Sequence, residues 1–87
     1  MNTSWAPKSE PSGGTVLTRE GYERLRKELE HLIRVRRPQV AQRLREAREF
    51  GDIRENAEFA AAKEEQAQIE ARIAELERLL RGARVVD

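Results

Sequence analysis

One interruption divides the helical pattern of this chain: Gly51-Asp52-Ile53-Arg54-Glu55-Asn56-Ala57-Glu58-Phe59. Gly-Asp is a turn signal, and two acidic residues three positions apart, Asp52 and Glu55, follow it directly. On both sides of this stretch, apolar residues recur at steps of three and four, the spacing of a helical seam. The sequence therefore predicts two helical arms joined by an acidic tip.

The first arm is predicted over residues 18–49. Thr18 is a favourable N-cap residue, and Leu17 before it is placed to pack against Tyr22. Pro38 interrupts this arm, and we expect a kink or a short break there, after which the helix resumes. The seam is Tyr22, Leu25, Leu29 and Leu32, and it continues one position out of phase as Ile33, Val40, Leu44 and Ala47.

The second arm is predicted over residues 55–81, after a tip at residues 50–55. Asp52 as N-cap and Glu55 three residues later form a variant of the capping box. Gly82 is a suitable C-terminal stop for the helix. The seam of this arm is Phe59, Ala62, Ile69, Ile73, Leu76 and Leu80, with Gln66 as its one polar member.

The two seams fit an antiparallel pair. If the arms pair antiparallel, the residue numbers of two facing seam residues should have a nearly constant sum. This sum is 106 near the tip and 105 farther from it, and the step of one falls beside the phase shift of the first seam. Residues 18–49 hold 10 basic and 6 acidic side chains and residues 52–81 hold 5 and 8, so the arms attract modestly. We therefore predict an all-α fold: an antiparallel two-helix coiled-coil hairpin over residues 16–82, behind a disordered tail at residues 1–15.

Composition limits the class of protein. The absence of cysteine excludes disulfides and thiolate metal sites, and 38% charged with 5% aromatic residues favours extended helices over a compact core. The N-terminus lacks the apolar core of a signal peptide, and no apolar run approaches the roughly 20 residues of a membrane span. We expect a cytoplasmic protein that does not contact membranes.

The two acids of the tip suggest a partial cation site. Mg²⁺ commonly takes one or two carboxylates together with waters and phosphate oxygens. Asp52 and Glu55 cannot form a closed site alone, so a partner would have to supply the other ligands. The alternative is that these two residues only cap a helix.

Three runs of this sequence, LTREGYERLRKELEHL, AREFGDIRENAEFAAAKEEQ and IEARIAELERLL, resemble the N-terminal coiled-coil domain of the Gre transcript-cleavage factors. The resemblance covers about residues 16–87. It implies that the hairpin enters the secondary channel of bacterial RNA polymerase as a monomer and presents Asp52 and Glu55 to the polymerase active site. There the two acids would help to bind a second Mg²⁺, shared with the polymerase, and to activate the water that cleaves the 3′ end of backtracked RNA.

The resemblance also implies roles for neighbouring residues. Asn56, Glu58 and Phe59 belong to the tip motif, and Phe59 lacks the hydroxyl of the tyrosine that is common in the family at this position. A basic stripe precedes the tip, and the family's basic patch implies that it contacts RNA phosphates. The alternative is a solvated basic face that pairs with the acidic second arm. The candidates for RNA contact are Arg36, Arg37, Arg43 and Arg48.

On this interpretation the chain is an accessory factor that stimulates hydrolysis by the polymerase and is not itself an enzyme. The family continues into a C-terminal FKBP-like domain, so residues 83–87 are expected to begin the linker to it. Two other functions stay open: a regulator that occupies the polymerase channel without stimulating cleavage, and a generic coiled-coil interaction module.

Overall fold

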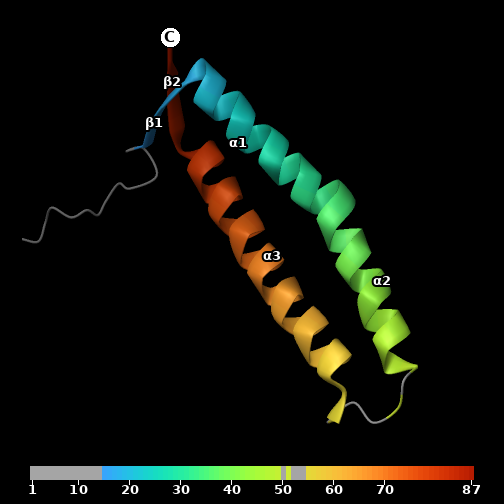
Figure 1. Cartoon of the computed structure of the whole chain (residues 1–87). Helices are drawn as coiled ribbons and strands as arrows, with labels where there is room; N and C mark the ends of the chain where they lie inside the picture. Colours follow the sequence, from blue (N-terminus) through green and yellow to red (C-terminus); the bar gives the residue numbers. More distant parts are fainter. Residues whose placement is uncertain (1–14, 50, 52–54) are drawn as a thin grey trace, which may run out of the picture. The chain divides into compact units, whose positions relative to one another are not determined.

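The computed structural model describes residues 15–49, 51 and 55–87. In chain order, β1 spans Thr15–Thr18, α1 spans Arg19–His31, the π-helix η3 spans Leu32–Arg36 and α2 spans Arg37–Arg48. After the tip, α3 spans Ala57–Arg81 and β2 spans Ala83–Val86 (Figure 1). The described residues fall into two compact units, one formed by Glu30–Ile73 and the other by residues 15–29 with Ala74–Asp87. The all-α class is confirmed, with one short strand pair added to it.

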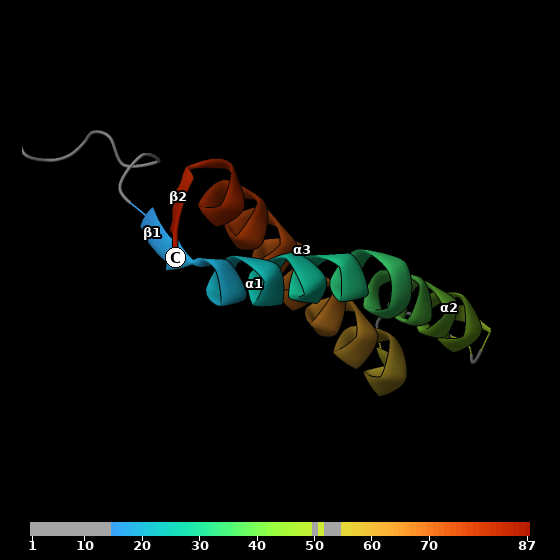
Figure 2. The same ribbon diagram turned by 90° about the horizontal axis from the view of Figure 1, so that it is seen from above.

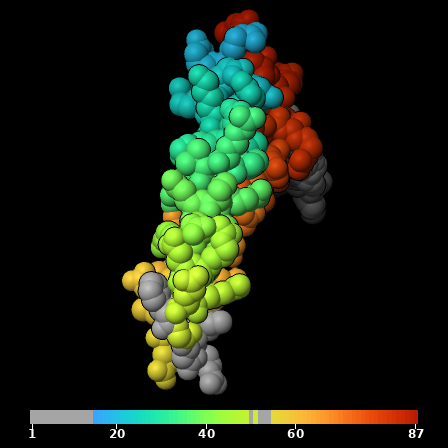
Figure 3. Space-filling model, turned by 90° about the vertical axis from the view of Figure 1, so that its right-hand side faces the viewer, coloured from blue at the N-terminus to red at the C-terminus, as the bar shows by residue number. Residues whose placement is uncertain are grey.

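The buried side chains are those of the predicted seams. The other residues of α2 are exposed or half-buried, and Figure 3 shows side chains of this helix at the surface. The helices α2 and α3 therefore each bury a narrow apolar stripe, whereas the seam residues of α1 and η3 are half-buried. Among the described residues, the buried apolar side chains are Val40, Leu44, Ala47, Ala62, Ile69, Ile73 and Leu76.

The π-helix η3 lies where the seam changes phase, just before Pro38. The backbone N–H of Arg37 donates to the carbonyl of Leu32, five residues back, which is the hydrogen bond of a π turn. Pro38 has no N–H, so the helix lacks one backbone hydrogen bond directly after this turn. Arg36 and Arg37 keep helical dihedral angles. The α-helix is therefore interrupted beside Pro38 and then resumes, as expected, but the interruption is one wide turn and not a break in the helix.

Strands β1 and β2 pair in parallel in the unit that holds both (Figure 2). The register matches Thr15 with Ala83 and Thr18 with Val86. Thr18 also caps α1 as predicted, because its Oγ1 accepts a hydrogen bond of 3.0 Å from the backbone N–H of Gly21. This pairing was not predicted, since Thr15 was expected in a disordered tail and residues 83–87 in a linker.

Candidate functional site

The candidate site is the tip between α2 and α3, of which the structure describes Gly51 and the residues from Glu55 onward. Gly51 has a φ of 119°, a backbone conformation that L side chains rarely adopt. Glycine therefore lets the chain leave the first arm at this point. The predicted catalytic acid Asp52 lies outside the described residues.

The helix α3 begins later than predicted, and Asn56 caps it. The Oδ1 atom of Asn56 accepts a hydrogen bond of 3.0 Å from the backbone N–H of Phe59, the third residue of the helix. The Asn56 carbonyl accepts the N–H of Ala60 at 3.0 Å, the first intrahelical bond. The prediction that Glu55 is the third residue of a helix capped by Asp52 is therefore wrong, since Glu55 precedes α3.

The side chain of Asn56 has a second partner on the other arm. Its Nδ2 atom donates a hydrogen bond of 2.5 Å to the backbone carbonyl of Ala47, in the last turn of α2. Asn56 is half-buried and Ala47 is 3% exposed, so this bond is shielded from bulk water. One amide group thus links the end of one helix to the start of the next.

Glu55 is exposed and directly precedes this link. No hydrogen bond or ion pair joins its carboxylate to another described residue, so its oxygens are accessible to a cation. Glu58, one turn further on, is also exposed and lies in the first turn of α3, where a negative charge is favourable. Within the part of the chain that the structure describes, no three His, Cys, Asp or Glu side chains are grouped as a metal site. Glu55 is therefore an exposed carboxylate at the tip that has no partner among the described residues.

Phe59 and Arg48 contact each other across the base of the tip. The guanidinium carbon of Arg48 lies 5.7 Å from the centroid of the Phe59 ring, a cation–π geometry. Phe59 is half-buried, whereas Arg48 is exposed. The aromatic side chain thus serves the packing of the two arms, which needs no hydroxyl.

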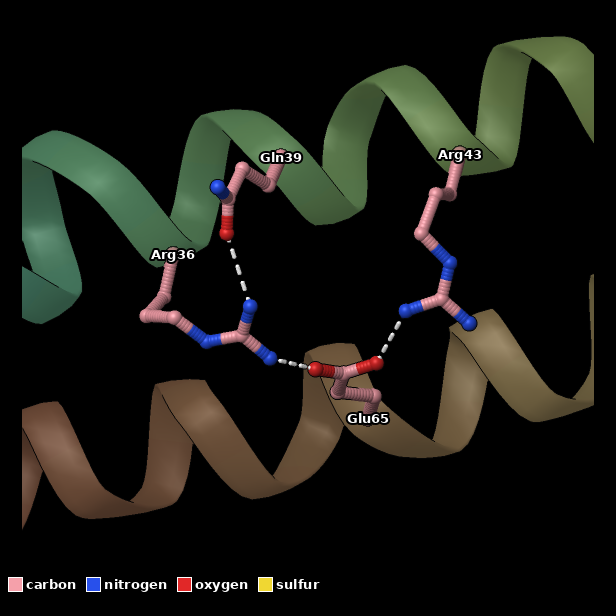
Figure 4. A network of polar contacts seen from close by, with 4 residues as sticks. All are labelled: Arg36, Gln39, Arg43 and Glu65. Carbon is pink, nitrogen blue, oxygen red and sulfur yellow. Dashed lines mark hydrogen bonds and ion pairs between the residues drawn. The ribbon is translucent and has the colours of Figure 1, made fainter.

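Two further arginines of the predicted RNA-contact stripe bind one acid on α3. Figure 4 shows Glu65 between Arg36 and Arg43, with one carboxylate oxygen directed at each guanidinium. Arg36 also donates a hydrogen bond of 2.7 Å to Oε1 of Gln39. The side chain of Glu65 is only 25% exposed, so these charges are partly removed from water.

Arg37 pairs with Glu70 through both oxygens of the carboxylate. Its Nε and Nη2 atoms each donate a hydrogen bond of 2.8 Å, the parallel two-bond arrangement that arginine forms with carboxylates. These hydrogen bonds hold the pKa of Glu70 below its ordinary value; burial opposes this lowering, and the positive charge of Arg37 adds a smaller lowering. For Arg36, Arg37 and Arg43, the described geometry is thus the pairing between arms that was the alternative to RNA contact.

Sequence reasoning placed Glu55, Asn56, Glu58 and Phe59 at the tip, and the structure brings these residues together within one turn before and after the start of α3. The sequence alone did not identify Glu65 as the shared partner of Arg36 and Arg43, or the hydrogen bond from Asn56 to α2. The preference of asparagine for N-cap positions was the available signal for the cap that Asn56 forms on α3.

In the part of the chain that the structure describes, none of the helices has the length and apolar character needed to span a membrane.

Comparison with known proteins covers most of the chain. Residues 15–85 match the GreA/GreB N-terminal family, described as "Transcription elongation factor, N-terminal". The chain is 54% identical over 71 residues to "Transcription elongation factor GreA" of Thermomicrobium roseum, which covers 82% of this chain and 46% of that protein. The protein of the same name from Nautilia profundicola is 56% identical over 71 residues, with 82% and 44% covered. The chain therefore spans about half the length of the relatives that it matches.

Proposed function

Since this chain belongs to the GreA/GreB family of transcription elongation factors through their N-terminal domain, we propose that it stimulates transcript cleavage by bacterial RNA polymerase. On this proposal the polymerase is the enzyme and this chain is the accessory factor. The tip enters the polymerase and places the carboxylates of Asp52 and Glu55 beside the 3′ end of backtracked RNA. The observation that carries the proposal is the carboxylate of Glu55, which is exposed and has no partner among the described residues, within the family's tip motif.

A shared Mg²⁺ explains why acids are needed at the tip. When bound, such an ion stabilises the attacking and leaving oxygens of the phosphodiester and favours ionisation of a water molecule. Glu55, which lies outside the helix, would supply a ligand oxygen to that ion or would accept the proton of the attacking water. Because Asp52 and Glu55 alone offer too few ligands for Mg²⁺, the chain would bind the ion only together with the polymerase.

Arg48 is the first candidate for contact with RNA phosphates. Its guanidinium lies over the Phe59 ring and forms no ion pair with a described residue, so it keeps its charge available. Arg36, Arg37 and Arg43 are already paired with acids of α3, and a phosphate would have to displace Glu65 or Glu70 to bind them. We therefore expect Arg48→Ala to weaken RNA contact more than Arg37→Ala does.

The test is RNA cleavage in backtracked polymerase complexes with Mg²⁺. Glu55→Gln removes the charge and keeps the size of the side chain, so cleavage should fall to the level without the factor while binding to the polymerase is retained. Glu64→Gln is the matched control, because Glu64 is an exposed acid on α3 away from the tip. Asp52→Asn should act like Glu55→Gln.

Stimulation of cleavage by Glu55→Gln at the wild-type level would reject the proposal. If Glu55→Gln no longer stimulates cleavage but inhibits elongation as strongly as the wild type does, the chain also occupies the channel as a regulator. Inhibition by a wild type that never stimulates cleavage would replace the proposal with that second function.

A further inference from the structure

We propose that Asn56 is a positioning residue that fixes Glu55 by joining the last turn of α2 to the first turn of α3. Both the oxygen and the nitrogen of its side-chain amide form hydrogen bonds. The oxygen caps α3 through Phe59, and the nitrogen holds the carbonyl of Ala47. The activity part of this inference rests on the proposed function, whereas the geometric part does not.

Both partners are backbone groups that a helix end leaves without an intrahelical bond. The first four N–H groups and the last four carbonyls of a helix need partners outside it, and Phe59 and Ala47 belong to these two sets. Asparagine supplies an acceptor and a donor on one short side chain. Aspartate lacks the donor, serine is too short to reach both groups, and alanine has neither function.

The link determines where Glu55 can lie. Glu55 is joined to Asn56 by one peptide bond, so their Cα atoms are about 3.8 Å apart. The bond from Asn56 to Ala47 joins residues nine apart and closes the tip at its base. Without it, the chain before Asn56 would be anchored only to α3, and the Glu55 carboxylate would sample more positions. Misplacement of a reacting group by about 1 Å can reduce a rate by about a hundredfold.

One substitution separates the two functions of the amide. Asn56→Asp keeps the acceptor for the Phe59 N–H and adds a negative charge that the start of a helix favours. It replaces the Nδ2 donor with an oxygen that repels the Ala47 carbonyl, so the link to α2 is lost while the cap remains. Asn56→Ala removes both bonds. Gln68→Glu is the matched control, an amide-to-acid change at an exposed site on α3.

The geometric readout is nuclear magnetic resonance of the full chain. In the wild type, an Nδ2 proton of Asn56 should exchange with water more slowly than the side-chain amide protons of Gln68. In Asn56→Asp, helix content and the protection of the Phe59 amide should persist, whereas the Glu55 amide should become more mobile on the picosecond-to-nanosecond timescale. Equal exchange of the Asn56 and Gln68 side chains, or unchanged Glu55 mobility in Asn56→Asp, would overturn the inference.

The second readout is the dependence of RNA cleavage on factor concentration. Asn56→Asp should lower the maximal cleavage rate by about tenfold or more and leave the half-saturating concentration unchanged, because the tip is misplaced and the binding surface is not. A shift in half-saturation alone would mean that Asn56 serves binding and would overturn the positioning role. If the wild type itself does not stimulate cleavage, the proposed function fails, and the resonance measurements still decide whether Asn56 holds Glu55.

Discussion

Deleting one residue from η3 should be tolerated, whereas deleting one residue from α2 should not. A π turn closes its hydrogen bond over five residues and an α turn over four, so η3 holds one residue more than an α turn does. Removing the exposed Arg34 should convert η3 to an α turn and leave the neighbouring turns at their present rotation about the helix axis. The turns of α2 around the exposed Gln42 are α-helical, so they contain no extra residue that could compensate for its removal.

The buried residues of α2 set the size of the difference. After deletion of Gln42, either Leu44 and Ala47 rotate by about 100° away from the core, or η3 relaxes and Val40 rotates instead. Val40 is 1% exposed and Leu44 is 8% exposed, and burying such a side chain contributes about 1.5–3 kcal/mol. The deletion of Arg34 removes its surface ion pair with Glu30, worth about 0–1 kcal/mol, and leaves the buried side chains of α2 on their present face.

Urea unfolding followed by far-UV circular dichroism measures both variants. A chain of this length has a total free energy of unfolding of about 4–13 kcal/mol. Exposing one core side chain by deleting Gln42 should therefore lower the urea concentration at the unfolding midpoint measurably. In a thermal scan the same loss corresponds to about 6–24 °C. Equal destabilisation by the two deletions, or a greater loss on removing Arg34, would refute the assignment of the extra residue to η3.

Two further predictions concern the ion pairs between the arms. Glu65→Gln removes the shared partner of Arg36 and Arg43, and should lower the free energy of unfolding by about 0.5–2 kcal/mol; a double-mutant cycle that shows no coupling of Glu65 to either arginine would contradict this. Arg37 holds the pKa of Glu70 below its ordinary value of 4.5, so the ionised carboxylate stabilises the folded chain above that pH, and this contribution is lost as the pH falls through the lower folded-state pKa. Arg37→Met should therefore raise the Glu70 pKa in a resonance titration, and Glu70→Gln should lessen the loss of stability below about pH 4.5; an unmoved pKa would refute the pairing in solution.

The apolar period predicted the buried side chains because burial on a helix is a local property. Residues three and four apart lie on one face whatever the rest of the chain does. Each of the seven buried residues, among them Val40, Ile73 and Leu76, was therefore identifiable from spacing alone. The end of α3 at Arg81 followed from Gly82 for the same reason.

The strand pair could not be predicted in this way. Thr15–Thr18 and Ala83–Val86 are four residues each, too short for an alternating pattern, and their partners lie at opposite ends of the described sequence. The cap of α3 was missed because two signals overlap. Asp52 and Asn56 are both good N-cap residues, and the acid three positions after Asp52 favoured the earlier start.

The ion pairs were predictable as a tendency but not as contacts. The opposite net charges of the arms indicated attraction, yet a long arginine side chain can reach several acids on a facing helix. Which acid Arg36 or Arg43 selects depends on the rotation of α2 after the π turn. That rotation arises from backbone geometry and does not follow from charge.

The parallel register of β1 and β2 has a mechanical consequence. Tension applied at Thr15 and at Val86 pulls the two strands along their length in opposite directions, because these residues lie at opposite ends of the aligned pair. All the bonds of the ladder are then loaded together in shear, and none can be unzipped one at a time. Force applied to the chain after Val86 would therefore load the β1–β2 pair in shear, the direction in which paired strands resist separation most strongly.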